Sequence, residues 1–128
     1  MVIGLFFGCL VAVVAHIFVE GVKYFSEIRI RVAPIEIAGF TLHYGQVFTL
    51  TVAAVAIYTL KRTLSIGRWH GPADSIFAAH RTDNELDVRT GLTSTLVAFL
   101  SASGGASVGQ YGPLVHFGAV IGSGLKRI

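Results

Sequence analysis

Three long stretches without a charged side chain constrain this chain more than any other feature of its sequence. No Asp, Glu, Lys or Arg occurs in residues 1–19, 37–60 or 90–125. A helix needs about 20 mostly apolar residues to cross the hydrocarbon core of a bilayer, so each stretch is long enough. The chain is 53% hydrophobic and only 13% charged, unlike an ordinary water-soluble domain. We therefore predict an all-α, multi-pass membrane protein with broken and re-entrant helices.

The basic residues stand mainly at the ends of these stretches, as membrane-interface anchors do, and form no face for nucleic acid. They include Lys23, Arg29, Arg31, Lys61, Arg62, Arg68, Lys126 and Arg127. The connection 61–89 carries more basic residues than 20–36, so the positive-inside rule predicts that 61–89 is cytoplasmic and 20–36 external. The first stretch lacks the basic start of a secretory signal, and its apolar run is too long for one. The expected partner is the lipid bilayer of the cell membrane.

Turn and breaker residues divide the chain into five expected helices. Their expected bounds are about 2–25, 40–62, 72–80, 90–102 and 112–127. Residues 26–36 predict an external loop with a short extended piece. The helix at 72–80 follows a Gly-Pro pair and is too short to span a bilayer, so we expect it to be re-entrant or interfacial.

An uncharged, glycine-rich break separates the last two helices. Residues 101–113 read Ser-Ala-Ser-Gly-Gly-Ala-Ser-Val-Gly-Gln-Tyr-Gly-Pro. A helix that restarts inside a membrane turns its N-terminal N–H groups, and the positive end of its dipole, toward the protein interior. Such an end binds an anion without a charged side chain, and Gly71-Pro72 predicts a second one. The alternative is that the glycines only permit close helix packing.

The order of residues in this break resembles the CLC chloride channels and transporters. The residues at the position of the family's Gly-Arg/Lys-Glu-Gly-Pro signature are Gly109, Gln110, Tyr111, Gly112 and Pro113. The flanking residues 103–109 and 114–123 are also similar, and 68–80 resembles bacterial members more loosely. The resemblance implies a voltage-gated chloride channel or transporter in which backbone N–H groups near 109–113 hold chloride. Chloride is then the transported ion, and no cofactor is expected.

Two signature positions depart from the family's pattern. Tyr111 stands in place of the gating glutamate, and Gln110 in place of its basic neighbour. A tyrosine side chain has a pKa near 10 and stays neutral, so it cannot carry protons as the glutamate does. We expect chloride conduction without tight proton coupling, with the Tyr111 ring as the gate. The alternative is that Tyr111 inactivates the site.

The family's pore-loop serine has no counterpart, because no serine lies in residues 67–72. The replacement is either His70 or the backbone N–H groups near Gly71. His70, Gly71 and Pro72 are therefore a candidate second pore loop, although a histidine at such a position is more often just an interfacial residue.

Catalytic and metal chemistry are not expected. Residues 105–109 fit the G-x-S-x-G pattern with Ser107 as nucleophile, but a hydrolase elbow requires a preceding strand and an acid before the histidine. No Asp or Glu follows Asp87. The histidines show no spacing typical of metal ligands; they are His16, His43, His70, His80 and His116. An intramembrane enzyme that uses Ser107 is thus the weakest alternative.

The length of the chain limits what it does alone. CLC transport domains are several times longer, so the resemblance implies that these 128 residues are the N-terminal portion of such a domain. We expect this portion to be inactive alone and to pair with the remaining half of the domain, as a homodimer in the full-length family. The alternative is a small structural or accessory membrane subunit without transport activity.

Overall fold

Five helices and one β-hairpin form the part of the chain that the structure describes. The computed structural model describes residues 2–32, 34–37, 39–81 and 86–125. Its helices are α1 (Val2–Arg31), α2 (Tyr44–Leu64), α3 (Pro72–Ala79), α4 (Val88–Gly104) and α5 (Tyr111–Leu125). Strands β1 (Ile35–Ile37) and β2 (Phe40–Leu42) pair antiparallel. The predicted all-α class is confirmed, with this short hairpin added.

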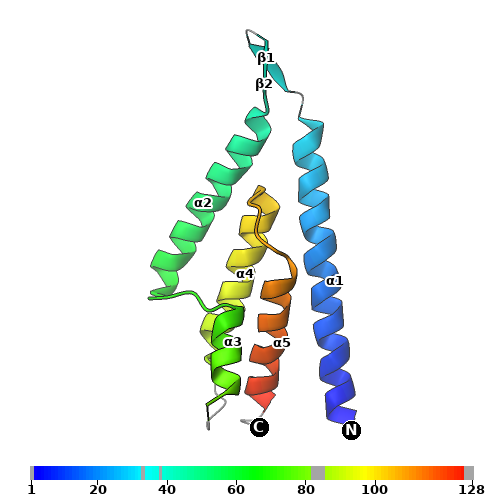
Figure 1. Cartoon of the computed structure of the whole chain (residues 1–128), viewed down its shortest axis with the longest axis vertical. Coiled ribbons are helices and arrows are strands. Elements are labelled where there is room, and N and C mark those ends of the chain that lie inside the picture. Colours follow the sequence, from blue (N-terminus) through cyan, green and yellow to red (C-terminus); the bar gives the residue numbers. More distant parts are fainter. Residues whose placement is uncertain (1, 33, 38, 82–85, 126–128) are drawn as a thin grey trace.

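Helix α4 packs between the two long helices. In Figure 1 the hairpin lies at the top, α1 and α2 diverge below it with α4 between them, and α3 and α5 lie lower, beside α4. The N-terminal end of α1 and the end of α5 both lie at the opposite end from the hairpin. Helices α3 and α5 both begin about halfway along α1 and run toward the same end. This places two helix N-termini at mid-height.

Helices α1 and α2 have outer faces suited to lipid. Over Gly4–Arg31 and over α2, the chain is long and apolar enough to cross a membrane, with mean hydropathies of 2.2 and 1.3. Leu5 is 73% exposed and Ile30 is 74% exposed. Extended apolar surfaces of this kind are costly in water and favourable in a bilayer.

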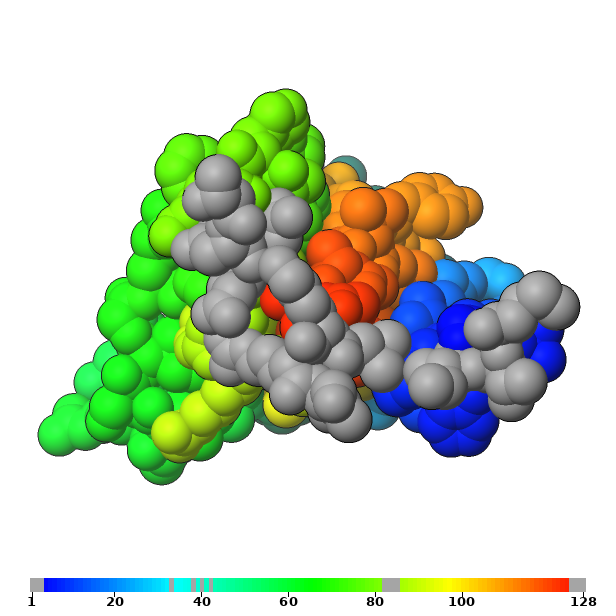
Figure 2. Space-filling model, turned by 90° about the horizontal axis from the view of Figure 1, so that it is seen from below, coloured from blue at the N-terminus to red at the C-terminus, as the bar shows by residue number. Residues whose placement is uncertain are grey.

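Two small buried clusters join the helices. The first consists of Phe18, Val22 and Ala102, and the second of Ala78, Leu86 and Val120. In the first, the rings of Phe18 and Phe99 pack edge to face with centroids 5.3 Å apart. Gly21 permits this approach, since a Cβ there would lie 2.8 Å from the Phe99 ring. Figure 2, seen from the end opposite the hairpin, shows α5 between α3 and α1.

Helix α1 is longer than the predicted 2–25, and the predicted loop at 26–36 is wrong over its first part. Arg29 explains the extra turns. Its Nη2 donates to Ser26 Oγ at 3.1 Å, and its Nη1 donates to the Ser103 carbonyl oxygen at 3.5 Å, at the end of α4. This contact with a distant part of the chain overrides weak local preference. The short extended piece expected in 26–36 is present as β1.

Helix α2 begins later than the predicted 40–62. Residues 40–42 pair with 35–37 instead, in the register Ile35 to Leu42 and Ile37 to Phe40. Gly39 has a φ of 82°, a left-handed conformation that favours glycine in a tight turn. At its other end α2 runs to Leu64, two residues further than expected.

The remaining helices lie close to their predicted positions. The sequence predicts 72–80, 90–102 and 112–127 for α3, α4 and α5. Helix α4 begins earlier because Asp87 caps it, with Oδ1 accepting the Arg89 N–H at 3.2 Å. Helix α5 begins one residue earlier, at Tyr111, whereas residues 126 and 127 lie outside the described residues.

Candidate functional site

The first turns of α3 and α5 lie against each other. A Cβ placed on Gly112 would lie 3.2 Å from Cγ of Pro72, so a larger residue would need its neighbour to move. Both helices begin at similar height and run the same way (Figure 1). The positive ends of their dipoles therefore reinforce each other at one place.

A cavity of about 410 Å³ adjoins these two N-termini. It is lined by His70, Gly71, Pro72, Ser94, Thr95, Ala98, Ser101, Val108, Gly109, Gly112, Pro113 and His116. Its lining is largely apolar, its polar side chains are the hydroxyls of Ser94, Thr95 and Ser101 and the two histidine rings, and no acidic side chain is among these lining residues. The volume is in the range of small-ligand sites. The cavity is therefore large enough for a small ion with some of its water.

The N-terminus of α5 exists because α4 stops abruptly. Gly105 has a φ of 103° and donates its N–H to the Ala102 carbonyl at 3.0 Å, while Ala106 donates to Ser101 at 3.0 Å. This is a Schellman ending, which requires a left-handed residue and so favours glycine. Helix α5 has no acidic residue in its first turn. Its first N–H groups therefore lack a carboxylate partner and are available to a ligand.

The N-terminus of α3 carries its own carboxylate. Asp74 Oδ2 accepts the Gly71 N–H at 2.8 Å, and Oδ1 pairs with Arg68. A negative group already occupies the place that an anion would take. The α3 end is therefore less available than its Gly-Pro sequence predicts.

Helix α4 contributes hydroxyl groups that the sequence analysis missed. Ser94, Ala98 and Ser101 line the cavity, and their i, i+4, i+7 spacing puts them on one helix face. Ser94 Oγ accepts the backbone N–H of His70 at 2.9 Å and donates to the Thr90 carbonyl at 2.7 Å. The sequence pattern that could have predicted this cavity-facing side of α4 is the helical spacing of small and polar residues within a charge-free stretch.

His116 is a further residue that the sequence analysis missed as part of the site. It is 1% exposed, and its Nδ1 lies 2.6 Å from Ser75 Oγ of α3. Its ring stands edge to face with that of His70, with centroids 6.3 Å apart. Both rings line the cavity, so the pair forms one wall between α3 and α5.

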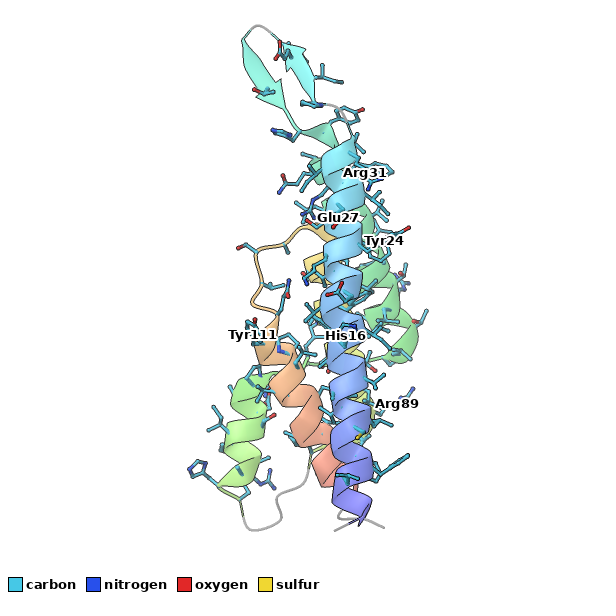
Figure 3. The ribbon with its side chains drawn as sticks, turned by 90° about the vertical axis from the view of Figure 1, so that its right-hand side faces the viewer. His16, Tyr24, Glu27, Arg31, Arg89 and Tyr111 are labelled. Atoms are coloured by element: carbon cyan, nitrogen blue, oxygen red, sulfur yellow. The ribbon has the colours of Figure 1, made fainter. Side chains whose placement is uncertain are left out.

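The structure brings six of the eight predicted site residues to the cavity. Those are His70, Gly71, Pro72, Gly109, Gly112 and Pro113. Gln110 and Tyr111 are not among the lining residues, and Tyr111 is 80% exposed. Figure 3 shows Tyr111 at the first turn of α5, at the level of His16 on α1. Successive side chains of a helix point in different directions, which explains why Gly112 faces the cavity and Tyr111 does not.

The hydrolase alternative finds no support in this geometry. Ser107 lies on the exposed loop after α4, whereas a nucleophile elbow follows a strand. Within residues 2–32, 34–37, 39–81 and 86–125, no group of three His, Cys, Asp or Glu side chains could hold a metal ion.

These features define a membrane protein with interrupted helices, in which two helix N-termini border a partly open cavity without acidic side chains. The chain belongs to the voltage gated chloride channel family, whose sequence pattern matches residues 50–128. That match includes every residue that lines the cavity. Comparison with curated proteins and with solved structures gave no significant match. The family consists of channels and transporters rather than enzymes, which agrees with the chemistry of the cavity.

Proposed function

We propose that this chain takes part in chloride transport across the cell membrane, with the ion held beside the N-terminus of α5. The observation that carries the proposal is the combination of a first turn without an acid and an adjoining cavity without an acidic side chain. Partial charges on N–H and O–H groups replace part of the hydration of the ion. They hold it less tightly than a fixed cation, so release stays fast.

The chain acts as part of a multi-pass assembly. Membership of a chloride channel family supports partnership with the remaining half of a transport domain, and assembly as a homodimer. Interrupted helices in lipid need neighbours to satisfy their free backbone groups. The transported ion is chloride, and no cofactor is required, because binding and release involve no bond making.

Transport is uncoupled from protons in this proposal. The gate position carries Tyr111 in place of the glutamate that carries protons in the exchangers of the family. The exposed ring of Tyr111 gates the approach to the cavity from outside it, rather than from within.

The test is chloride efflux from proteoliposomes that contain the protein expressed from its full gene, with valinomycin to carry K⁺. We expect efflux well above that of protein-free liposomes, and no proton uptake when a chloride gradient is applied. Efflux equal to protein-free liposomes would instead favour an accessory subunit. Stoichiometric proton movement would contradict the uncoupled mechanism.

A further inference from the structure

An apolar crevice lies between α1, α2 and α4, in the half of the molecule nearer the hairpin. It has a volume of about 260 Å³, and its lining includes Phe25, Phe48, Val52 and Phe99. Phe48 is 67% exposed and Val52 is 52% exposed, so the crevice is continuous with the apolar outer surface of α2. An open crevice with apolar walls favours an apolar occupant.

Arg29 also lines this crevice, and it has no acidic partner there. No Asp or Glu is among the lining residues, and within the described residues the ion pairs leave Arg29 out. Its guanidinium contacts neutral oxygens instead, Ser26 Oγ at 3.1 Å and the Ser103 carbonyl at 3.5 Å. A guanidinium has more N–H donors than these contacts use. Arg29 is thus a half-buried cation with donors to spare, and an anionic group is the partner that suits it.

The position of Arg29 along α1 puts it at the depth of lipid headgroups. Helix α1 has 30 residues, about 45 Å at 1.5 Å per residue, which exceeds the roughly 30 Å of a hydrocarbon core. Arg29 lies in the last turn of α1. The crevice extends from there toward the middle of the membrane, because α2 runs away from the hairpin and contributes residues from Phe48 to Ala56.

We propose that this crevice binds one anionic phospholipid from the leaflet at the hairpin end, with its phosphate on Arg29 and an acyl chain between α1, α2 and α4. A guanidinium matches the geometry of a phosphate and pairs with it through two N–H groups. The acyl chain covers apolar walls that otherwise face loosely packed lipid. The bound lipid lies against the last turn of α4, since Ser103 and Gly104 line the same crevice.

The first test measures the headgroup by native mass spectrometry of the protein expressed from its full gene, in detergent. Dioleoylphosphatidylglycerol is compared with dioleoylphosphatidylcholine, which has the same chains and no net charge. We expect one phosphatidylglycerol to bind about fivefold more tightly, the effect of one basic residue beside a lipid phosphate. Arg29→Gln should remove this preference. Arg31→Gln is the matched control, because Arg31 is exposed at the same end of α1 (Figure 3) and is not a lining residue.

The second test measures the acyl chain and leaves Arg29 in place. Ala56→Phe puts a ring into the crevice, whereas Ala54→Phe makes the same change at an exposed position of α2 that does not line it. The affinity for phosphatidylglycerol should fall at least about threefold in Ala56→Phe, because apolar area of the chain is no longer buried, and should stay unchanged in Ala54→Phe. This pair decides the question even if Arg29→Gln fails to fold. Glycerol 3-phosphate, a headgroup without chains, should not compete with the lipid.

Several results would overturn the inference. Equal affinity for the two lipids, or equal losses in Arg29→Gln and Arg31→Gln, would remove the phosphate from Arg29. Lipid binding that ignores Ala56→Phe would show that no acyl chain occupies the crevice, as expected where another segment of the full protein covers it. Competition by glycerol 3-phosphate would assign Arg29 to a soluble phosphate instead. Chloride efflux is measured separately, so none of these results decides the proposed function.

Discussion

The N-termini of α3 and α5 lie side by side and adjoin the same cavity, but only one of them has an acidic residue in its first turn. Helix α3 has Asp74 in its first turn, bonded to the Gly71 N–H at 2.8 Å, whereas α5 has no acid there. Helix α4 resembles α3, since Asp87 caps it. A carboxylate at a helix N-terminus stabilises the helix and occupies its anion site at once. The N-terminus of α5 thus lacks a stabilising carboxylate cap, and its first N–H groups are left available to a ligand.

The largest effect should follow from making α5 resemble α3. Gln110→Asp places a carboxylate directly before the first residue of α5. It would accept the free N–H groups and repel an anion at close range, so chloride efflux should fall by about tenfold or more, roughly 1.4 kcal/mol. Gln110→Asn is the matched control, because it caps without charge and should keep most of the flux. Full efflux in the Asp variant would show that this N-terminus does not face the ion.

The break that creates the α5 end is the next point to test. Gly105→Ala puts a side chain on a residue with a φ of 103° and against the guanidinium of Arg29. We expect the free energy of unfolding in detergent to fall by about 1 kcal/mol. At Gly109 a Cβ would meet nothing within 4 Å, so Gly109→Ala should change the free energy of unfolding by less than about 0.5 kcal/mol. Equal losses at the two positions would contradict the special role of Gly105.

The reverse exchange, removing the carboxylate from α3, should have a smaller effect of opposite sign. Asp74→Asn keeps an oxygen to accept the Gly71 N–H but removes the charge. The apparent affinity for chloride should rise about threefold, because one negative charge near the cavity is gone. Arg68→Gln is the control, since it removes the exposed ion pair and leaves the carboxylate. An equal rise in both variants would assign the effect to the ion pair.

The smallest effect concerns the cap of α4 and pH. The hydroxyl of Thr90, followed by backbone N–H groups, lowers the pKa of Asp87. A lowered pKa means that the ionised cap stabilises the folded state above the unfolded carboxyl pKa of about 3.9, and that this stability is lost as pH falls below it. The loss should be under about 1 kcal/mol, measured by thermal unfolding between pH 6 and about 3. In Asp87→Asn this part of the pH dependence should disappear; its persistence would assign it to another group.

The interruptions of the chain could be predicted from sequence because each has a local cause. Gly71-Pro72 begins α3, and the glycine pair at 104–105 ends α4, as expected from backbone conformation alone. The membrane class followed from the charge-free stretches, since the distribution of charge depends on no tertiary contact.

The remaining features depend on contacts between distant parts of the chain. Arg29 extends α1 through the Ser103 carbonyl, 74 residues away in sequence. The contact between Ser75 Oγ and His116 Nδ1 joins two helices through residues 41 positions apart in sequence. The exposure of Tyr111 depends on which face of α5 packs against α3 and α4. Aligning a sequence signature by position does not predict how the helix is rotated about its axis.

The bond between Arg29 and Ser103 has a mechanical consequence. It ties the end of α1 next to the hairpin to the last turn of α4, where the interruption begins. A displacement of α1 along its own axis would separate the guanidinium from that carbonyl. The last turn of α4, next to the loop that leads to α5, would then lose this hydrogen bond to α1. Movement of a lipid-facing helix would thereby reach the start of α5 through a single side chain.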